Sequence, residues 1–408
     1  MTQPRPTVGG VIRSVLDEFL GANGPRLMPE QRRTLKDLAA CRTAALGGHV
    51  LGCLECGHLQ IAYNSCGNRH CPTCQATAAA RWLEARAAEL LPVPYFHVVF
   101  TLPDVLDPLA LANPRVVYDL LLRCAAETVL ELAADPHHLG ARTGVLAVLH
   151  TWGQTLQFHP HVHCVVPGGG LSPDRTCWVG SRPDFFLPIE VLSAVFRGKF
   201  LAGLRAASAR GQLRLSSQRT NRRTANTEFE RLVSAAVRTH WVVHVKRPFA
   251  GPEVVLKYLA RYTHRVAISN SRLLDFEGGF VRFRYKDYAH GSRKRVMKLT
   301  ASEFVRRLLL HVLPTGFVRI RHYGFLANRV CQEKLAQCRA LLGVEATPEP
   351  IAAECSAEPR ESLEEVAEAK VCPSCGAGRM VLVATVQALP ANQREWGLIV
   401  GRAGFDTS

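Results

Sequence analysis

Three histidines alternate with other residues in the segment His159–His163 (His-Pro-His-Val-His), and this pattern constrains the fold more than any other. Side chains of a β-strand point alternately to its two faces, so the three imidazoles share one face, about 6–7 Å apart. The apolar run 164–166 continues the strand, Pro167 and three glycines end it, and the apolar run 144–152 predicts a neighbouring strand. We expect a divalent metal site on this strand pair. The alternative is an ordinary polar strand face with hydrogen-bonded histidines.

The charge of the chain indicates a polyanionic partner. Its 408 residues include 50 Lys and Arg against 34 Asp and Glu, a net charge of +16. An excess of this size favours nucleic acid, although a basic, soluble surface is the alternative. No apolar run reaches the length of a membrane span, and the N-terminus lacks the apolar core of a signal peptide. We therefore expect a cytoplasmic protein without a membrane partner.

Two Cys-x-x-Cys knuckles predict a zinc ribbon near the N-terminus. Cys53 and Cys56 form the first knuckle, and Cys71 and Cys74 form the second after a loop of 14 residues. Four thiolates at this spacing can close one tetrahedral Zn²⁺ site, whereas a redox dithiol is the alternative for either knuckle. A small, loop-rich module of this kind takes much of its stability from the metal.

Other cysteines and histidines leave the number of zinc sites open. Four of them lie near the ribbon and either form a second site or replace one knuckle: Cys41, His49, Cys66 and His70. A further knuckle, Cys372–Cys375, has no second pair after it. Either Cys331 and Cys338 complete that knuckle, or it is a remnant or a dimer contact, and the sequence does not decide.

Tyr258 and Tyr262 lie one helical turn apart in the helix that we predict for residues 252–265. At this spacing their β-carbons are about 5–6 Å apart on one helix face. Both rings belong to the core if the helix is simply amphipathic, but the nearby Arg261 and Arg265 argue against an apolar face. A phenol is a weak nucleophile at its free pKa near 10, and a metal or arginine nearby favours the reactive phenolate.

A predicted hairpin over residues 281–299 supplies the candidate DNA surface. Its first strand alternates apolar and cationic residues, and its second strand is also basic. Single-stranded DNA binds to a cationic groove with aromatic stacking partners, for which Tyr288 and Tyr323 are candidates. The alternative for each charge is a solvated face. The cationic candidates are Arg282, Arg284, Lys286, Arg293, Lys294 and Arg295, with Arg261 and Arg265 of the tyrosine helix.

Together, these motifs resemble the two-tyrosine HUH transposases of the insertion sequence 91 family. The resemblance covers most of the chain: the ribbon with residues 68–72, and the segments 96–103, 150–154, 159–170 and 258–270. It implies an α+β fold, in which an HUH endonuclease domain has a central antiparallel sheet flanked by helices. An N-terminal helical and zinc-ribbon module precedes this domain.

The resemblance also implies roles for particular residues. His161 and His163 bind Mg²⁺ or Mn²⁺, and Tyr258 and Tyr262 are the nucleophiles that form 5′-phosphotyrosine. A third metal ligand is expected among His159, Gln157 and Gln154. The implied reaction is rolling-circle transposition, in which single-stranded DNA at the transposon ends and the target is nicked and rejoined. The zinc at Cys53, Cys56, Cys71 and Cys74 is structural or helps to bind DNA.

Six segments are expected: N-terminal helices (1–45), the ribbon and a connecting helix (46–91), the HUH domain (92–320), a helix (321–342), a flexible acidic linker (343–370) and a Cys-x-x-Cys tail (371–408).

A plasmid relaxase or replication initiator would share the histidines and tyrosines, but the ribbon and the lack of a helicase P-loop favour a transposase. A non-enzymatic zinc-ribbon DNA-binding protein would not need the tyrosines, and a metallohydrolase would form no covalent adduct. The recognised DNA and the oligomeric state remain open.

Overall fold

The computed structural model describes residues 5–75, 89–183, 186–215, 222–249, 266–288, 290–344 and 371–390. The chain divides into two compact units: residues 1–78, 268–312 and 351–408 form the first, and residues 79–267 and 313–350 form the second. Residues 268–312 therefore cluster with the cysteine-bearing module, and the boundaries 92–320 expected for the HUH domain stay a prediction. The linker prediction for 343–370 and the connecting helix fall largely outside the described residues.

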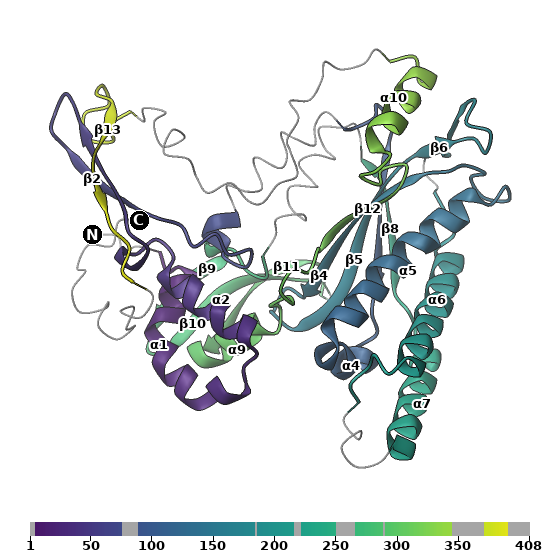
Figure 1. Ribbon diagram of the computed structural model, residues 1–408, viewed down its shortest axis with the longest axis horizontal. Helices are drawn as coiled ribbons and strands as arrows, with labels where there is room; N and C mark the ends of the chain where they lie inside the picture. Colours follow the sequence, from purple (N-terminus) through teal and green to yellow (C-terminus); the bar gives the residue numbers. More distant parts are fainter. Residues whose placement is uncertain are drawn as a thin grey trace. The chain divides into compact units, whose positions relative to one another are not determined.

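A five-stranded antiparallel sheet forms the centre of the second unit (Figure 1). The two strands predicted from the histidine pattern lie in its middle and pair with each other, which confirms the antiparallel sheet. Its strands in spatial order are β12 (Ile320–Gly324), β4 (Gly144–Trp152), β5 (Phe158–Pro167), β3 (Tyr95–Thr101) and β8 (Val243–Phe249). A short two-stranded sheet, β6 (Gly169–Leu171) and β7 (Trp178–Gly180), follows β5.

Long helices cover one face of this sheet. Helices α5 (Pro114–Ala134) and α6 (Ile189–Ala209) lie side by side along it, after the short α4 (Asp107–Ala112), and α7 (Arg222–Arg238) follows (Figure 1). Buried apolar residues recur at helical spacing in α6, at Leu192, Phe196, Phe200 and Leu204. They join one core with alternate residues of β3, β4 and β5, so the remaining residues of these strands face the other way.

The predicted helix over 321–342 begins later than expected. Residues 320–324 instead form β12, which hydrogen-bonds to the edge of β4, and α10 runs only from Cys331 to Leu341. Gly324 ends the strand with a φ of +62°, and a Cβ there would lie 2.1 Å from the carbonyl oxygen of Thr143. This close approach requires glycine. Helix α10 packs over the sheet face opposite the long helices.

The first unit joins helices and two small sheets. Helices α1 (Val8–Asn23) and α2 (Pro29–Ala40) are the expected N-terminal pair, and α9 (Ala301–Leu309) packs against α1. One sheet has the order β13 (Met380–Val386), β1 (Gly48–Cys53), β2 (Leu59–Tyr63). The other contains β9 (Leu273–Glu277), β10 (Phe280–Asp287) and β11 (Arg293–Thr300), which includes the predicted hairpin.

None of the described helices is long and apolar enough to cross a bilayer.

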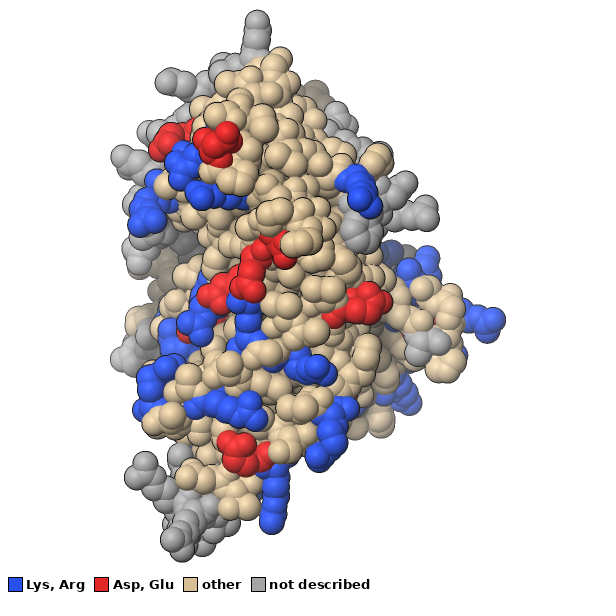
Figure 2. All heavy atoms as spheres, turned by 90° about the vertical axis from the view of Figure 1, so that its right-hand side faces the viewer, with Lys and Arg blue, Asp and Glu red and all other residues tan. Residues whose placement is uncertain are grey.

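Figure 2 shows the side on which α6 and α7 lie in Figure 1. Lys and Arg side chains outnumber acidic ones there, but uncharged and acidic residues separate them. Among the described residues drawn, this face therefore lacks a continuous cationic patch.

Candidate functional site

Three histidines from two neighbouring strands meet on the sheet face opposite the long helices. They are His150 on β4 and His161 and His163 on β5, and their ligand nitrogens all lie within 4.8 Å of one another. The ring centroids are 4.8 Å apart for His161 and His163, 5.5 Å for His150 and His161, and 4.5 Å for His150 and His163. Neutral imidazoles that converge in this way can hold a divalent metal ion.

The register between β4 and β5 brings these rings together. His150 lies directly opposite His161 in the antiparallel ladder. Leu149 and Val162 belong to the core beneath the long helices, so strand alternation turns the histidines to the opposite face. Residues opposite each other on one face are about 4.5–5.5 Å apart, nearer than alternate residues of the same strand.

This geometry adds His150 to the candidates for the third ligand, which the sequence left open among His159, Gln157 and Gln154. His159 shares the face, with its ring centroid 5.2 Å from that of His161, but the metal-binding group contains His150 instead. The His159 Nδ1 lies 4.0 Å from a carboxylate oxygen of Asp104, and its side chain is 42% exposed. Burial lowers the pKa of His159, and Asp104 opposes that shift.

Hydrogen bonds orient two of the three rings. The Nδ1 of His161 donates to the backbone carbonyl of His159 at 2.7 Å, which leaves Nε2 as its ligand atom. The Nδ1 of His163 lies 2.7 Å from Nε2 of His97 on β3, and the two rings stack with centroids 5.0 Å apart. When His163 binds a metal through Nε2, its Nδ1–H donates to His97.

His97 can accept that hydrogen bond because it is neutral. The residue is 1% exposed, and burial lowers its pKa to about 3, with further contributions from Lys246, His244 and His161. Sequence reasoning missed both His97 and His150. Strand alternation could have identified them. When β3 and β4 are paired with β5, both His97 and His150 point to the same sheet face as His161 and His163.

We expect His97→Phe to weaken Mn²⁺ binding at the histidine site by about 10–100-fold, the usual effect of losing such a partner. Phenylalanine keeps a stacked ring but cannot accept the His163 proton. The measurement is a titration of free Mn²⁺ by electron paramagnetic resonance on the full chain. His97→Gln, which retains an acceptor, should restore part of the affinity. Equal affinity in the wild type and the phenylalanine variant would rule out a positioning role.

The tyrosine helix with Tyr258, Tyr262, Arg261 and Arg265 lies outside the described residues. The strand that precedes it is described: β8 pairs with β3 and ends at Phe249, opposite Tyr95. In the sequence, Tyr258 follows the end of this edge strand by nine residues.

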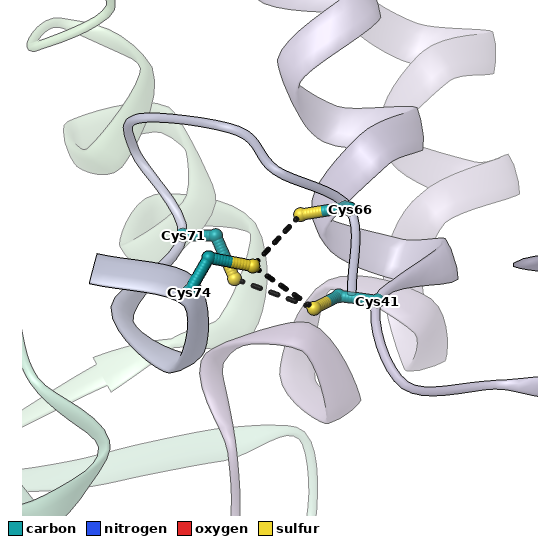
Figure 3. A group of neighbouring side chains, drawn as sticks. All are labelled: Cys41, Cys66, Cys71 and Cys74. Carbon is teal, nitrogen blue, oxygen red and sulfur yellow. Dashed lines mark hydrogen bonds between the residues drawn. The ribbon is translucent and has the colours of Figure 1, made fainter. Parts of the chain in front are cut away.

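A first cluster of four cysteines lies beside the C-terminal end of α2 (Figure 3). The Sγ–Sγ distances are 3.5 Å for Cys41–Cys71, 3.7 Å for Cys41–Cys74 and 3.6 Å for Cys66–Cys74. Zn–S bonds of about 2.3 Å place tetrahedral ligands about 3.8 Å apart, which these distances match closely. Hydrogen bonds among the four thiols lower the pKa of Cys71 and Cys74 and raise the pKa of Cys41 and Cys66, so the four share their protons as one group.

A second cluster contains the other knuckle. The Sγ atoms of Cys53 and Cys375 are 3.8 Å apart, and those of Cys56 and Cys372 are 3.7 Å apart. All four sulfur atoms lie within 4.8 Å of one another. Thus Cys372–Cys375 is completed by Cys53 and Cys56, and not by Cys331 and Cys338 of the second unit.

The prediction that both N-terminal knuckles share one zinc ion is therefore wrong. Cys53 and Cys56 lie at the tight turn between β1 and β2, whereas Cys66 follows the far end of β2. A strand of five residues spans about 17 Å, too far for one ion. Cys41 and Cys66 instead complete the first cluster with Cys71 and Cys74, as one alternative from the sequence anticipated. His49 and His70 belong to neither cluster.

The predicted DNA-binding cations divide between the two faces of the β10–β11 hairpin. The cross-strand register places Arg282, Arg284, Lys286, Lys294 and Lys298 on one face, with Arg293 and Arg295 on the other. Arg282 pairs with Asp275 at 2.5 Å and Arg295 with Asp287 at 3.2 Å. Exposed Tyr288 lies 5.0 Å from Nζ of Lys286, and Phe280 lies 4.3 Å from Nζ of Lys298. This first face combines cations with aromatic rings, as single-stranded nucleic acid requires.

Comparison with known proteins shows the family of the chain. Residues 144–334 match the family model described as "Putative transposase", and residues 11–102 match "Transposase zinc-binding domain". The chain is 51% identical over 400 residues to "Putative transposase y4qJ" of Sinorhizobium fredii, covering 97% of this chain and 99% of the relative. It is 31% identical over 378 residues to "Transposase for insertion sequence element IS801" of Pseudomonas savastanoi pv. phaseolicola, covering 87% and 84%. No solved structure matches the chain.

Proposed function

Because this chain belongs to the insertion sequence 91 family of transposases, we propose that it cuts and rejoins single-stranded DNA at its element's ends by rolling-circle chemistry. The main support is the convergence of His150, His161 and His163 on one sheet face. Mg²⁺ or Mn²⁺ held by these residues would polarise the phosphodiester and offset charge in the transition state. Three imidazoles suit Mn²⁺ better than Mg²⁺, which prefers oxygen ligands.

In this proposal, Tyr258 and Tyr262 supply the nucleophilic oxygens. A phenolate attacks phosphorus, the bond to the 3′ oxygen breaks, and the 5′ phosphate remains on the tyrosine. The leaving 3′ oxygen takes up a proton in place of the one that the phenol released, giving a free 3′-OH. One phosphoester replaces another, so the step can reverse or transfer the strand to a different 3′-OH. Two tyrosines permit two such intermediates in sequence.

The test is incubation of the full chain with Mn²⁺ and labelled single-stranded oligonucleotides that carry the element ends. We expect a protein–DNA band that persists on a denaturing gel, together with a released strand that a polymerase can extend from its 3′-OH. Cutting without the band would favour the metallohydrolase alternative. Binding without cutting would favour a non-enzymatic zinc-dependent DNA-binding protein.

We further propose that the cationic face of the β10–β11 hairpin contacts the DNA. The double variant Arg284→Ala/Lys294→Ala should bind single-stranded DNA more weakly, and the slope of log K against log salt should become shallower by about 1.4, near 0.7 per lost phosphate contact. Fluorescence anisotropy at several salt concentrations measures this slope. Arg295→Ala is the control, because Arg295 lies on the other face and pairs with Asp287. Equal slopes for the two variants would contradict a specific role for this face.

A further inference from the structure

The second cysteine cluster joins segments from the two ends of the chain. Cys56 and Cys372 are 316 positions apart in sequence, yet their sulfur atoms are 3.7 Å apart. The matched zinc-binding model covers residues 11–102 and the transposase model residues 144–334, so Cys372 and Cys375 lie outside both. We propose that Cys53, Cys56, Cys372 and Cys375 bind a zinc ion that fastens residues 371–390 to the N-terminal module.

The backbone around the C-terminal knuckle is arranged for metal-bound thiolates. The N–H of Ser374 points to Cys372 Sγ at 3.4 Å, and the N–H of Gly378 points to Cys375 Sγ at 3.3 Å. Such donors stabilise the negative charge of a ligating sulfur. A Cβ at Gly378 would lie 2.3 Å from Cys53 Sγ, so this position must be glycine for the two knuckles to meet. The turn is closed by the Cys372 N–H, which donates to the Gly378 carbonyl at 2.8 Å.

Apart from the cluster, the tail has few apolar contacts with the module. Strand β13 pairs antiparallel with β1, from Gly48 opposite Val386 to Cys53 opposite Met380. Met380 is buried, but Leu382 is 48% and Val383 is 60% exposed. A single edge strand with so little buried apolar surface is marginal without another constraint. Zinc binding by four thiolates supplies that constraint, because its free energy contributes directly to folding.

The two clusters differ in exposure, and this gives them different susceptibility to metal loss. The first cluster has two buried and two half-buried cysteines, and its ligands all fall between residues 41 and 74. In the second, Cys56 and Cys375 are exposed. A chelator reaches exposed thiolates more readily, so the second ion should leave first. Its loss would release β13 and uncover the edge of β1, while the first cluster keeps its ion.

The first test compares zinc content in full-length variants by native mass spectrometry. Cys372→Ser/Cys375→Ser should carry one zinc ion fewer than the wild type, and Cys41→Ser/Cys66→Ser should lose the other ion. Gly378→Val, which retains every ligand, should also lose the second ion because its side chain collides with Cys53. Cys177→Ser is the control, since Cys177 is exposed and belongs to neither cluster. Unchanged zinc in Cys372→Ser/Cys375→Ser would overturn the proposal.

The second test follows the tail in the wild-type chain, so it does not depend on whether a variant folds. Hydrogen exchange is measured during mild chelation. When the first equivalent of zinc leaves, the amides of residues 380–386 should exchange like an unstructured segment, while residues 66–74 stay protected. Protection of the tail after both ions have left would show that zinc does not fasten it. Loosening of residues 66–74 before the tail would reverse the proposed order and contradict it.

Discussion

His150→Ala is expected to lower the rate of single-strand cutting by about 10³-fold or more, whereas His159→Ala changes it little. Removing one of three imidazoles weakens the metal site. A bound ion contributes several kcal/mol to transition-state stabilisation, and a loss of about 4 kcal/mol lowers the rate 10³-fold. His159 is a matched control: it has the same side chain on the same strand face, two positions from His161, but lies outside the metal-binding group. Its backbone carbonyl, which orients His161, survives in the alanine variant.

The measurement combines initial cutting rates on an element-end oligonucleotide with Mn²⁺ affinity and DNA affinity for each variant. DNA affinity should remain close to that of the wild type, which separates loss of metal from loss of fold. Because His150 is 2% exposed and stacks on Trp152 at 4.6 Å, His150→Phe is a second variant that preserves the packing while removing the ligand. If His159→Ala proves the more damaging change, then His159 and not His150 is the third ligand.

Tyr258→Phe combined with Tyr262→Phe is expected to remove the covalent protein–DNA band completely. Each substitution removes only the phenolic oxygen that bonds to phosphorus, so the aromatic rings and their packing remain. The assay is the denaturing gel with labelled DNA, and the single variants show whether one tyrosine or both form adducts. Tyr288→Phe is the control, because this exposed ring on the hairpin keeps its stacking surface.

A covalent band that survives in the double variant would place the nucleophile elsewhere in the chain. Cutting that continues without a band would mean that water is the nucleophile, as in the metallohydrolase alternative. If only one single variant loses the band, the chain works as a one-tyrosine enzyme. These outcomes are distinct from loss of the metal site, since Mn²⁺ affinity should be unaffected by either tyrosine substitution.

Local sequence patterns predicted much of the fold because they report on single elements. Alternation in residues 281–286 predicted a strand with one cationic face, and β10 has that face. Helical spacing predicted α1, and Thr300 caps α9 by accepting a hydrogen bond from the Glu303 N–H. Each pattern depends on the geometry of one strand or helix, which a short stretch of residues determines.

Elements whose partners are distant in sequence were harder to predict. Residues 320–324 resemble the start of a helix, yet they form an edge strand because β4 offers free backbone groups for pairing. The C-terminal knuckle had no visible partner for the same reason, since its partner knuckle lies more than 300 residues earlier.

The sequence by itself determined that imidazoles share one strand face and that cysteines occur in knuckles, and its resemblance to a known family implied the α+β fold. The tertiary structure alone decided that His150 converges with His161 and His163 and that the cysteines form two clusters. The physical reason is that a metal site depends on distances across strands and between chain ends. Antiparallel register placed His150 opposite His161, and the length of β2 separated the two N-terminal knuckles.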